Sequence, residues 1–169
     1  MTDNFLTLGI ETSCDETSAS VVQGSKHVLS NIVASQFDLH SKYGGVVPEL
    51  ACRRHLEIIE KVVQSALDEA KVTEDSINLI AVVHGPGLIG ALLIGVMFAK
   101  AYALSSGKPL IGLNHLEAHL YSTIMSHDNI PFPAIGLIVS GGHTSLYYMP
   151  DSGKYKLLGS TVDDAVGES

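Results

Sequence analysis

The chain has 169 residues, of which 46% are apolar and 17% charged, a composition typical of a globular protein with a substantial core. Its formal net charge of −8 and its scattered basic residues argue against a free-standing nucleic-acid binder, because phosphate contacts need clustered Lys and Arg. Cys14 and Cys52 lack the spacing of a metal finger or a redox pair, so we expect reduced thiols and a cytoplasmic protein.

The chain opens with a predicted three-stranded meander. Apolar runs over 5–10, 17–22 and 27–34 have strand length and are separated by polar or glycine-containing turns. The loop between the first two strands carries three carboxylates, which belong to Glu11, Asp15 and Glu16. That is more polar chemistry than a hairpin needs, so both a functional loop and a solvated turn remain open at this point.

Helices and strands alternate from Pro48 onward. Proline is favoured at a helix start, and apolar residues recur at helical spacing from there through Ala70. A strand over 77–83 then runs into a Gly-Pro-Gly turn and a second helix over 88–104. The turn would let backbone N–H groups approach a phosphate, although a tight helix start explains it equally well. Glycines and Lys100 interrupt the second helix, which favours a buried helix over a membrane span.

A strand over 110–113 leads into a predicted helix that carries His115 and His119. Four residues apart on a helix, two imidazoles share one face with their Cβ atoms about 5–6 Å apart, close enough for both to bind one metal ion. The helix begins at the carboxyl end of a strand, where ligand sites of open α/β sheets gather. Histidines that bind no metal are the alternative reading of such a pair.

A zinc-protease helix is a further alternative for the same pair. Such a helix places the glutamate that acts as general base directly after the first histidine. Here that position is Leu116, and Glu117 lies about 200° around the helix from His115. The protease reading therefore lacks its base.

The region after residue 133 repeats the opening. Apolar strand, polar loop, Thr-Ser pair and apolar strand describe both 6–22 and 135–149, and a third strand over 155–159 follows the second hairpin. We infer a duplicated β-β-β-α-β-α-β lobe, with the first copy over 1–132 and only three strands of the second within 133–169. The two polar hairpin loops would face one cleft, where glycine loops can bind nucleotide phosphates through backbone N–H groups. The alternative is that the second loop is only a tight hairpin turn.

Five motifs follow one another along the chain: Gly-Ile-Glu-Thr-Ser-Cys-Asp-Glu-Thr at 9–17, Gly-Gly-Val-Val-Pro-Glu-Leu-Ala at 44–51, Gly-Pro-Gly-Leu at 85–88, the His115/His119 pair, and Val-Ser-Gly-Gly-His-Thr at 139–144. In this order they resemble the TsaD family, the tRNA N6-adenosine threonylcarbamoyltransferases, whose older name is the glycoprotease or O-sialoglycoprotein endopeptidase family. The resemblance continues into Asp-Asp-Ala-Val-Gly-Glu at 163–168, so it covers almost the whole chain, although family members are roughly double its length.

The resemblance implies an α/β fold, the actin-like ATPase lobe of sugar kinases and heat-shock chaperones, which is RNase H-like. It also implies transfer of a threonylcarbamoyl group from threonylcarbamoyl-adenylate to N6 of the tRNA adenosine beside the anticodon. One divalent metal per subunit, iron in preference to zinc, would be bound by His115, His119 and an aspartate from the second half of the family's sequence. Glu11, Asp15 and Glu16 match a loop associated with activity, and Asp15 or Glu16 is the expected base.

The resemblance further implies a bound nucleotide, either threonylcarbamoyl-adenylate or ATP/AMP, on the glycine loop after the second set of strands. The implied partners are tRNA, a paralogous TsaB-like scaffold subunit and a small TsaE-like ATPase subunit, with no membrane. The residues expected to bind the nucleotide are Ile138, Val139, Ser140, Gly141, Gly142 and His143.

Two other functions compete with this interpretation. The paralogous scaffold has the same fold without catalysis, but that type of subunit lacks the His-x-x-x-His pair. A metalloprotease lacks its base, as argued above. Because one metal ligand and one side of the nucleotide cleft belong to the missing half, the isolated chain is expected to be an incomplete catalytic subunit.

Overall fold

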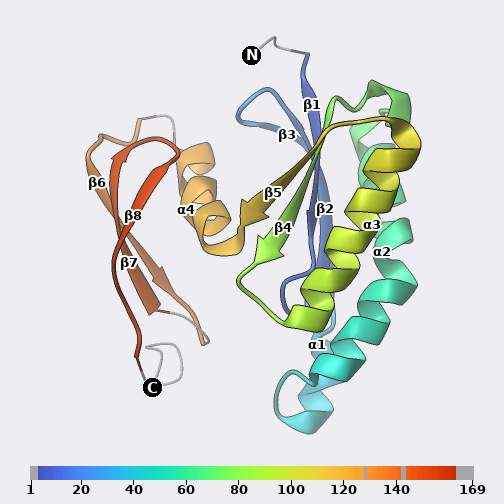
Figure 1. Cartoon of the computed structure of the whole chain (residues 1–169), viewed down its shortest axis with the longest axis horizontal. Coiled ribbons are helices and arrows are strands. Elements are labelled where there is room, and N and C mark those ends of the chain that lie inside the picture. Colours follow the sequence, from blue (N-terminus) through green and yellow to red (C-terminus); the bar gives the residue numbers. More distant parts are fainter. Residues whose placement is uncertain (1–3, 128, 142–143, 163–169) are drawn as a thin grey trace. The chain divides into compact units, whose positions relative to one another are not determined.

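In the computed structural model, which describes residues 4–127, 129–141 and 144–162, β1 (Leu6–Glu11) is the central strand of a five-stranded sheet (Figure 1). The strands lie in the order β3-β2-β1-β4-β5. Strands β1, β2 and β3 are antiparallel, whereas β1, β4 and β5 run parallel. The carboxyl ends of the parallel strands therefore meet at one edge. The other strands are β2 (Glu16–Gln23), β3 (His27–Ser35), β4 (Leu79–Gly85) and β5 (Leu110–Asn114).

Helices α2 (Pro48–Ala70) and α3 (Ile89–Ser106) lie side by side and cover one face of this sheet (Figure 1). Pro48 is the first residue of α2, as its sequence predicts. The core between helices and sheet includes the fully buried Leu8 and Ile80, and burying one such side chain contributes about 1.5–3 kcal/mol. Three one-turn elements escaped sequence prediction: α1 (Phe37–His40), η1 (Ser41–Tyr43) and η2 (Glu74–Ser76).

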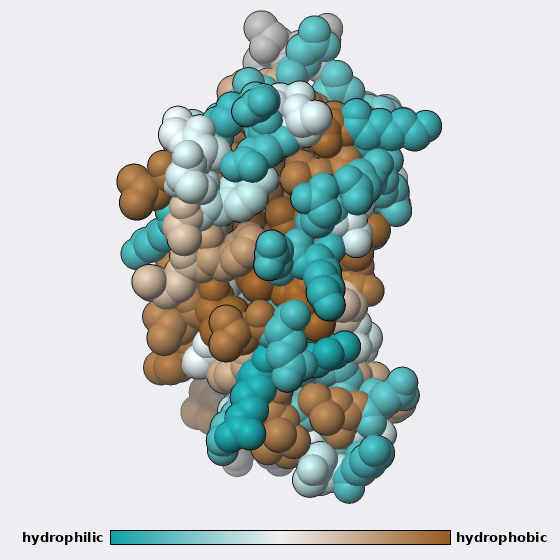
Figure 2. All heavy atoms as spheres, turned by 90° about the vertical axis from the view of Figure 1, so that its right-hand side faces the viewer, coloured by the Kyte–Doolittle hydropathy of each residue, from teal (hydrophilic) through white to brown (hydrophobic). Residues whose placement is uncertain are grey.

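Helix α3 is buried along one face only, which corrects the expectation of a buried helix. Ala91, Gly95 and Ala99 face the core. On its outer side, Ile89 is 87% exposed, Leu93 59%, Met97 56% and Leu104 85%. By length and hydropathy α3 would suffice to span a membrane, a test that core helices of globular proteins also pass. Figure 2 shows apolar side chains, interrupted by polar ones, on the face of the molecule that α2 and α3 form.

A second unit, from Leu116 onward, contains helix α4 (His115–Ser126) apart from its first residue, and a three-stranded antiparallel sheet in the order β6-β7-β8. This order repeats the β1-β2-β3 meander of the first sheet, as the inferred duplication predicts. Its strands are β6 (Ala134–Val139), β7 (Thr144–Asp151) and β8 (Lys154–Ser160).

The two compact units divide between His115 and Leu116, whereas the sequence predicts lobes over 1–132 and 133–169. Helix α4 accounts for the difference, because Leu116 and Leu120 pack in one cluster with Tyr147 of β7. Gly136 in β6 lets the helix approach, since a Cβ there would lie 2.5 Å from Leu120 Cδ2. The lobe boundary at 132/133, as a statement about the duplication, stays a prediction.

Candidate active site

The loop that follows β1 is held by its own backbone carbonyl groups. The N–H of Leu88 donates to the carbonyl of Ser13 at 2.7 Å, and the N–H of Gln36 donates to that of Asp15 at 3.0 Å. Between them, His55 Nε2 donates to the carbonyl of Cys14 at 3.0 Å. Three consecutive carbonyls are thus bound by three different segments: the turn before α3, the end of β3 and helix α2.

Two glycines allow the turn before α3 and helix α3 itself to pack tightly against this loop. A Cβ on Gly87 would lie 2.5 Å from the Ser13 carbonyl oxygen, and one on Gly95 would lie 2.2 Å from Thr12 Oγ1. Thr12 Oγ1 itself donates to the carbonyl of Ala91 at 2.8 Å, so α3 is fastened to the loop. Of the two readings of the Gly-Pro-Gly turn, close packing at the helix start accounts for Gly87 without a phosphate.

Glu11 and His115 bring the ends of β1 and β5 together. Glu11 Oε2 lies 3.0 Å from His115 Nδ1, and Ser13 Oγ lies 3.2 Å from the same nitrogen. The other oxygen of Glu11 accepts the Ser13 N–H. Burial raises the pKa of Glu11, but the hydrogen bonds from His115 and Ser13 together outweigh it, so the pKa lies below its ordinary value.

This contact determines the tautomer of His115. An ionised carboxylate only accepts hydrogen bonds, so Nδ1 carries a proton and, in the neutral imidazole, the lone pair lies on Nε2. A histidine held in this way by a carboxylate is the usual arrangement of a metal ligand, because the carboxylate fixes the ring and makes its other nitrogen more basic. The donor set of His115 therefore suits a metal ion.

His119 follows one turn later on α4 and is exposed. Leu116, between the two histidines, is buried in the apolar cluster of the second unit, and Glu117 is exposed. Among the described residues, no group of three His, Cys, Asp or Glu side chains could hold a metal ion. Metal binding by the His115/His119 pair stays a prediction.

The remaining acidic residues of the loop differ in exposure. Asp15 is half-buried and Glu16, the first residue of β2, is exposed. Burial and the hydrogen bond with Asp15 raise the pKa of the Cys14 thiol to about 11. Cys14 is therefore a protonated thiol at neutral pH and a poor nucleophile.

The glycine loop of the second unit is described only in part. Ile138 and Val139 end strand β6, with Ile138 half-buried, and Ser140 and Gly141 follow it in exposed positions. Gly142 and His143 lie outside the described residues. Nucleotide contact by this segment stays a prediction.

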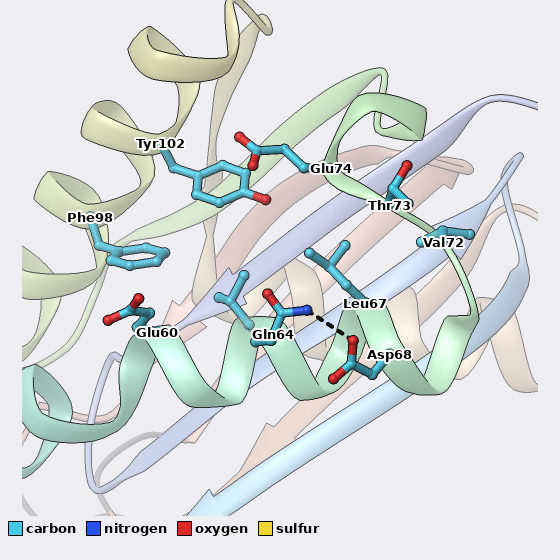
Figure 3. Close-up of a pocket in the computed structure, with 10 residues that line it drawn as sticks. Glu60, Gln64, Leu67, Asp68, Val72, Thr73, Glu74, Phe98 and Tyr102 are labelled. Atoms are coloured by element: carbon cyan, nitrogen blue, oxygen red, sulfur yellow. Dashed lines mark hydrogen bonds between the residues drawn. The ribbon is translucent and has the colours of Figure 1, made fainter.

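Two hollows of the first unit lie outside the expected site. One, of about 450 Å³, lies between α2, η2 and α3, where Phe98 and Tyr102 stack with ring centroids 5.9 Å apart (Figure 3). Burial and the nearby Glu74 raise the pKa of Tyr102. The other, of about 470 Å³, includes Arg53 and Arg54 in its lining. None of the residues predicted to act in the site lines either hollow.

Sequence reasoning missed the residues that support the loop, chiefly Gln36, His40 and His55. All three are buried and hydrogen-bonded to one another. One signal could have found His55: it lies midway between Ala51 and Ile59 on the apolar face of α2, where a polar side chain needs a partner.

Comparison with known proteins identifies the family of this chain. The TsaD family model, tRNA N6-adenosine threonylcarbamoyltransferase, matches residues 27–169. The chain belongs to the TsaD family. A protein of that name from Protochlamydia amoebophila (strain UWE25) is 60% identical over 166 residues, which cover 98% of this TsaD chain and 48% of the relative. One from Clostridium botulinum (strain Hall) is 53% identical over 169 residues, which cover 100% of the chain and 50% of the relative.

The TsaD chain thus spans about half the length of the curated relatives it matches. Among solved structures, YeaZ from Pseudomonas aeruginosa is similar with a TM-score of 0.58 and 15% identity, over 93% of this chain and 66% of that one. The ethanolamine utilization protein EutJ from Carboxydothermus hydrogenoformans has a TM-score of 0.55 and 12% identity, over 94% and 52%. These likenesses confirm the predicted actin-like ATPase fold.

Proposed function

We propose that this chain is the first half of a catalytic subunit that transfers threonylcarbamoyl from threonylcarbamoyl-adenylate to N6 of the tRNA adenosine beside the anticodon. The observation that carries the proposal is the contact between Glu11 and His115, at 3.0 Å, because it prepares one histidine of the His-x-x-x-His pair as a metal ligand. The paralogous scaffold type lacks that pair, so the pair favours the enzyme.

In the proposed reaction the N6 amine attacks the carbamoyl carbon, the bond from that carbon to the phosphate oxygen of the adenylate breaks, and AMP leaves. His115 and His119 would hold a divalent ion, iron in preference to zinc, together with an aspartate from the second half of the family's sequence. Such an ion, when bound, polarises a carbonyl as a Lewis acid. The leaving AMP needs no protein nucleophile, which fits a Cys14 thiol with a pKa of about 11.

The three acids of the loop divide between two roles. Glu11 is already engaged by Ser13 and His115, so we assign it to positioning His115. Asp15, which is half-buried, or Glu16, which is exposed, would accept the proton that the amine loses. Ile138 to His143 would bind the adenylate through backbone N–H and hydroxyl groups.

The partners are proposals of the same kind. The exposed apolar stripe of α3, formed by Ile89, Leu93, Met97 and Leu104, would pack against a TsaB-like scaffold subunit of the same fold. Four large apolar side chains along one outer helix face are what a packed subunit interface needs at its core. A small TsaE-like ATPase would complete the assembly, and tRNA would bind it in the cytoplasm, where Cys14 and Cys52 stay reduced.

The decisive experiment is single-turnover transfer to tRNA by this chain and by its full-length form, with metal content measured on the same samples. We expect the full-length form to transfer and the shorter chain to be impaired. Replacing His115 or His119 by alanine should remove bound metal and transfer together. Variants that keep both would contradict the metal site, and a double Asp15→Asn, Glu16→Gln variant with an unchanged rate would refute the assignment of the base.

A further inference from the structure

A chain of buried polar groups runs through the first unit, beneath the acidic loop. Thr17, Gln36, His40 and His55 are all buried. Polar side chains in such positions cost free energy unless they are hydrogen-bonded. Within the described part of the chain, no buried side-chain nitrogen or oxygen lacks a partner. These four residues satisfy one another, and the two ends of their chain are backbone groups.

The hydrogen bonds connect the segment before α2 to the loop after β1. Gln36 lies at the middle of the chain, with one histidine on each side. The links are Val47 N to His40 Nδ1 at 3.3 Å, His40 Nε2 to Gln36 Oε1 at 3.2 Å, Gln36 Nε2 to His55 Nδ1 at 3.4 Å, Thr17 Oγ1 to His55 Nδ1 at 2.8 Å, and His55 Nε2 to the Cys14 carbonyl at 3.0 Å.

The two ends fix every proton between them. The N–H of Val47 can only donate and the carbonyl of Cys14 can only accept, so both histidines carry their proton on Nε2 and a lone pair on Nδ1. A flipped Gln36 amide would face His40 Nε2 with its NH₂ group, and His40 would then need to accept at both nitrogens, which a neutral imidazole cannot do. The hydrogen bonds therefore point in one direction, from Val47 to Cys14.

We propose that His55 is a positioning residue, which holds the acidic loop through the Cys14 carbonyl and ties it to Val47 through Gln36 and His40. A second proton on His55 keeps the bond to Cys14 and loosens the loop through Gln36. A proton on His55 Nδ1 would be accepted by Thr17 Oγ1, 2.8 Å away, once that hydroxyl turns, but it would also face the NH₂ group of Gln36 at 3.4 Å. Relieving that conflict by turning the amide would reverse the bond to His40 and release Val47. The same residue, Gln36, also holds the Asp15 carbonyl through its backbone N–H.

The charges around His55 set the pH at which this happens. Burial lowers its pKa most, and His40 also disfavours the proton, whereas the Cys14 carbonyl, Glu11 and Asp15 favour it. The net pKa is lower than the ordinary value of 6.5. Because the unfolded chain binds this proton more readily than the folded one, the stability that depends on neutral His55 is present above pH 6.5 and is lost as the pH falls toward the lowered pKa.

The test is amide hydrogen exchange, which needs no catalytic activity. The Leu88 N–H reports on the loop because it donates to the Ser13 carbonyl, and the Ile80 N–H, bonded to Pro109, reports on the fold. His55→Leu removes the donor to Cys14, whereas the side-chain amide in His55→Gln keeps a donor that does not titrate. In His55→Leu we expect exchange at Leu88 to accelerate about tenfold or more, with Ile80 unchanged, and His55→Gln to stay close to the parent.

The acid dependence supplies a second measurement that does not need the leucine variant to fold. After correction for intrinsic exchange rates, protection of Leu88 in the parent chain should fall as the pH drops below 6.5, and His55→Gln should abolish that fall. Protection that is unchanged in a folded His55→Leu variant, or an acid dependence that survives in His55→Gln, would overturn the proposal.

The effect on transfer rests on the proposed function and is measured separately in the full-length protein. His55→Leu should lower kcat while leaving the KM for tRNA nearly unchanged, because the residue acts on the loop and not on the substrate. If exchange behaves as expected and kcat does not change, the positioning role fails while the transferase assignment stands. If the parent shows no transfer, the proposed function fails, and exchange still decides whether His55 holds the loop.

Discussion

Glu11 Oε2 and His115 Nδ1 lie 3.0 Å apart, although the two residues are separated by 104 positions in the sequence. The contact joins the end of β1 to the first residue of α4, at the edge where the parallel strands of the first sheet end. Both side chains are mostly buried, so water screens this contact less than it screens a contact on the surface. Its chemical consequence is that the lone pair of the neutral His115 ring lies on Nε2.

Glu11→Gln should therefore weaken metal binding by the full-length protein. An amide still accepts a hydrogen bond but does not make the imidazole more basic, and loss of such a supporting carboxylate typically lowers metal affinity about 10–100-fold. Affinity is measured by competition with a chelator of known strength. Glu16→Gln is the matched control, because Glu16 is exposed at the start of β2. Equal affinities in the two variants would show that Glu11 does not prepare His115.

The arrangement of strands could be predicted from the sequence because it follows from alternation and turn chemistry. Helix α2 begins and ends as its sequence predicts, at Pro48 and Ala70. The family resemblance then brought His115 and the acidic loop together as parts of one site. None of these inferences needs tertiary contacts.

The supporting contacts could not be predicted, and the reason is physical. Gln36 and His40 carry no sequence pattern that marks them as support for the loop. The place of His55 on the apolar face of α2 shows that it needs a partner but not which one, because the Cys14 carbonyl lies 41 positions away. The exposure of the outer face of α3 could not be predicted for a related reason. Its composition is apolar on all sides, so the sequence predicts burial without showing which side the core covers.

Cys14 should react slowly with alkylating agents at neutral pH. Burial and Asp15 raise the pKa of its thiol to about 11, and only the thiolate reacts. In a Cys52→Ser background, the rate of modification by iodoacetamide should rise about tenfold per pH unit between pH 8 and 10. Asp15→Asn should lower the pKa of Cys14, because it removes the charge that opposes the thiolate. A rate that levels off near pH 9 in the parent would contradict the raised pKa.

Gly95→Ala should destabilise the first unit although alanine is the better helix former. The propensity gain in a helix interior is about 1 kcal/mol, but the new Cβ would lie 2.2 Å from the buried Thr12 Oγ1, which is bonded to Ala91. Crowding of this kind costs about 1–3 kcal/mol. We expect a lower free energy of unfolding in urea.

Gly45→Ala serves as the control for that experiment, because a Cβ on Gly45 meets nothing within 4 Å. The double variant Gly95→Ala, Thr12→Ala should be less destabilised than the sum of its single changes, since it removes the hydroxyl oxygen that the added Cβ would meet. Additive effects would mean that α3 and the loop are not coupled through Thr12.

Leu93→Lys and Met97→Lys should leave the fold stable and weaken subunit association. Both side chains are more than half exposed on α3, and substitutions at exposed sites usually change stability by less than about 0.5 kcal/mol. At the centre of an interface, the same changes place a charge where the partner offers apolar surface, and we expect at least about tenfold weaker binding of the TsaB-like subunit. Calorimetric titration measures the affinity, and thermal unfolding measures the stability.

Leu92→Ala, at a buried position of the same helix, is the control. It should lower the stability by about 2–5 kcal/mol and leave the affinity for the scaffold subunit unchanged. If the two lysine variants bind the scaffold as tightly as the parent, the stripe is not the interface and another surface must be.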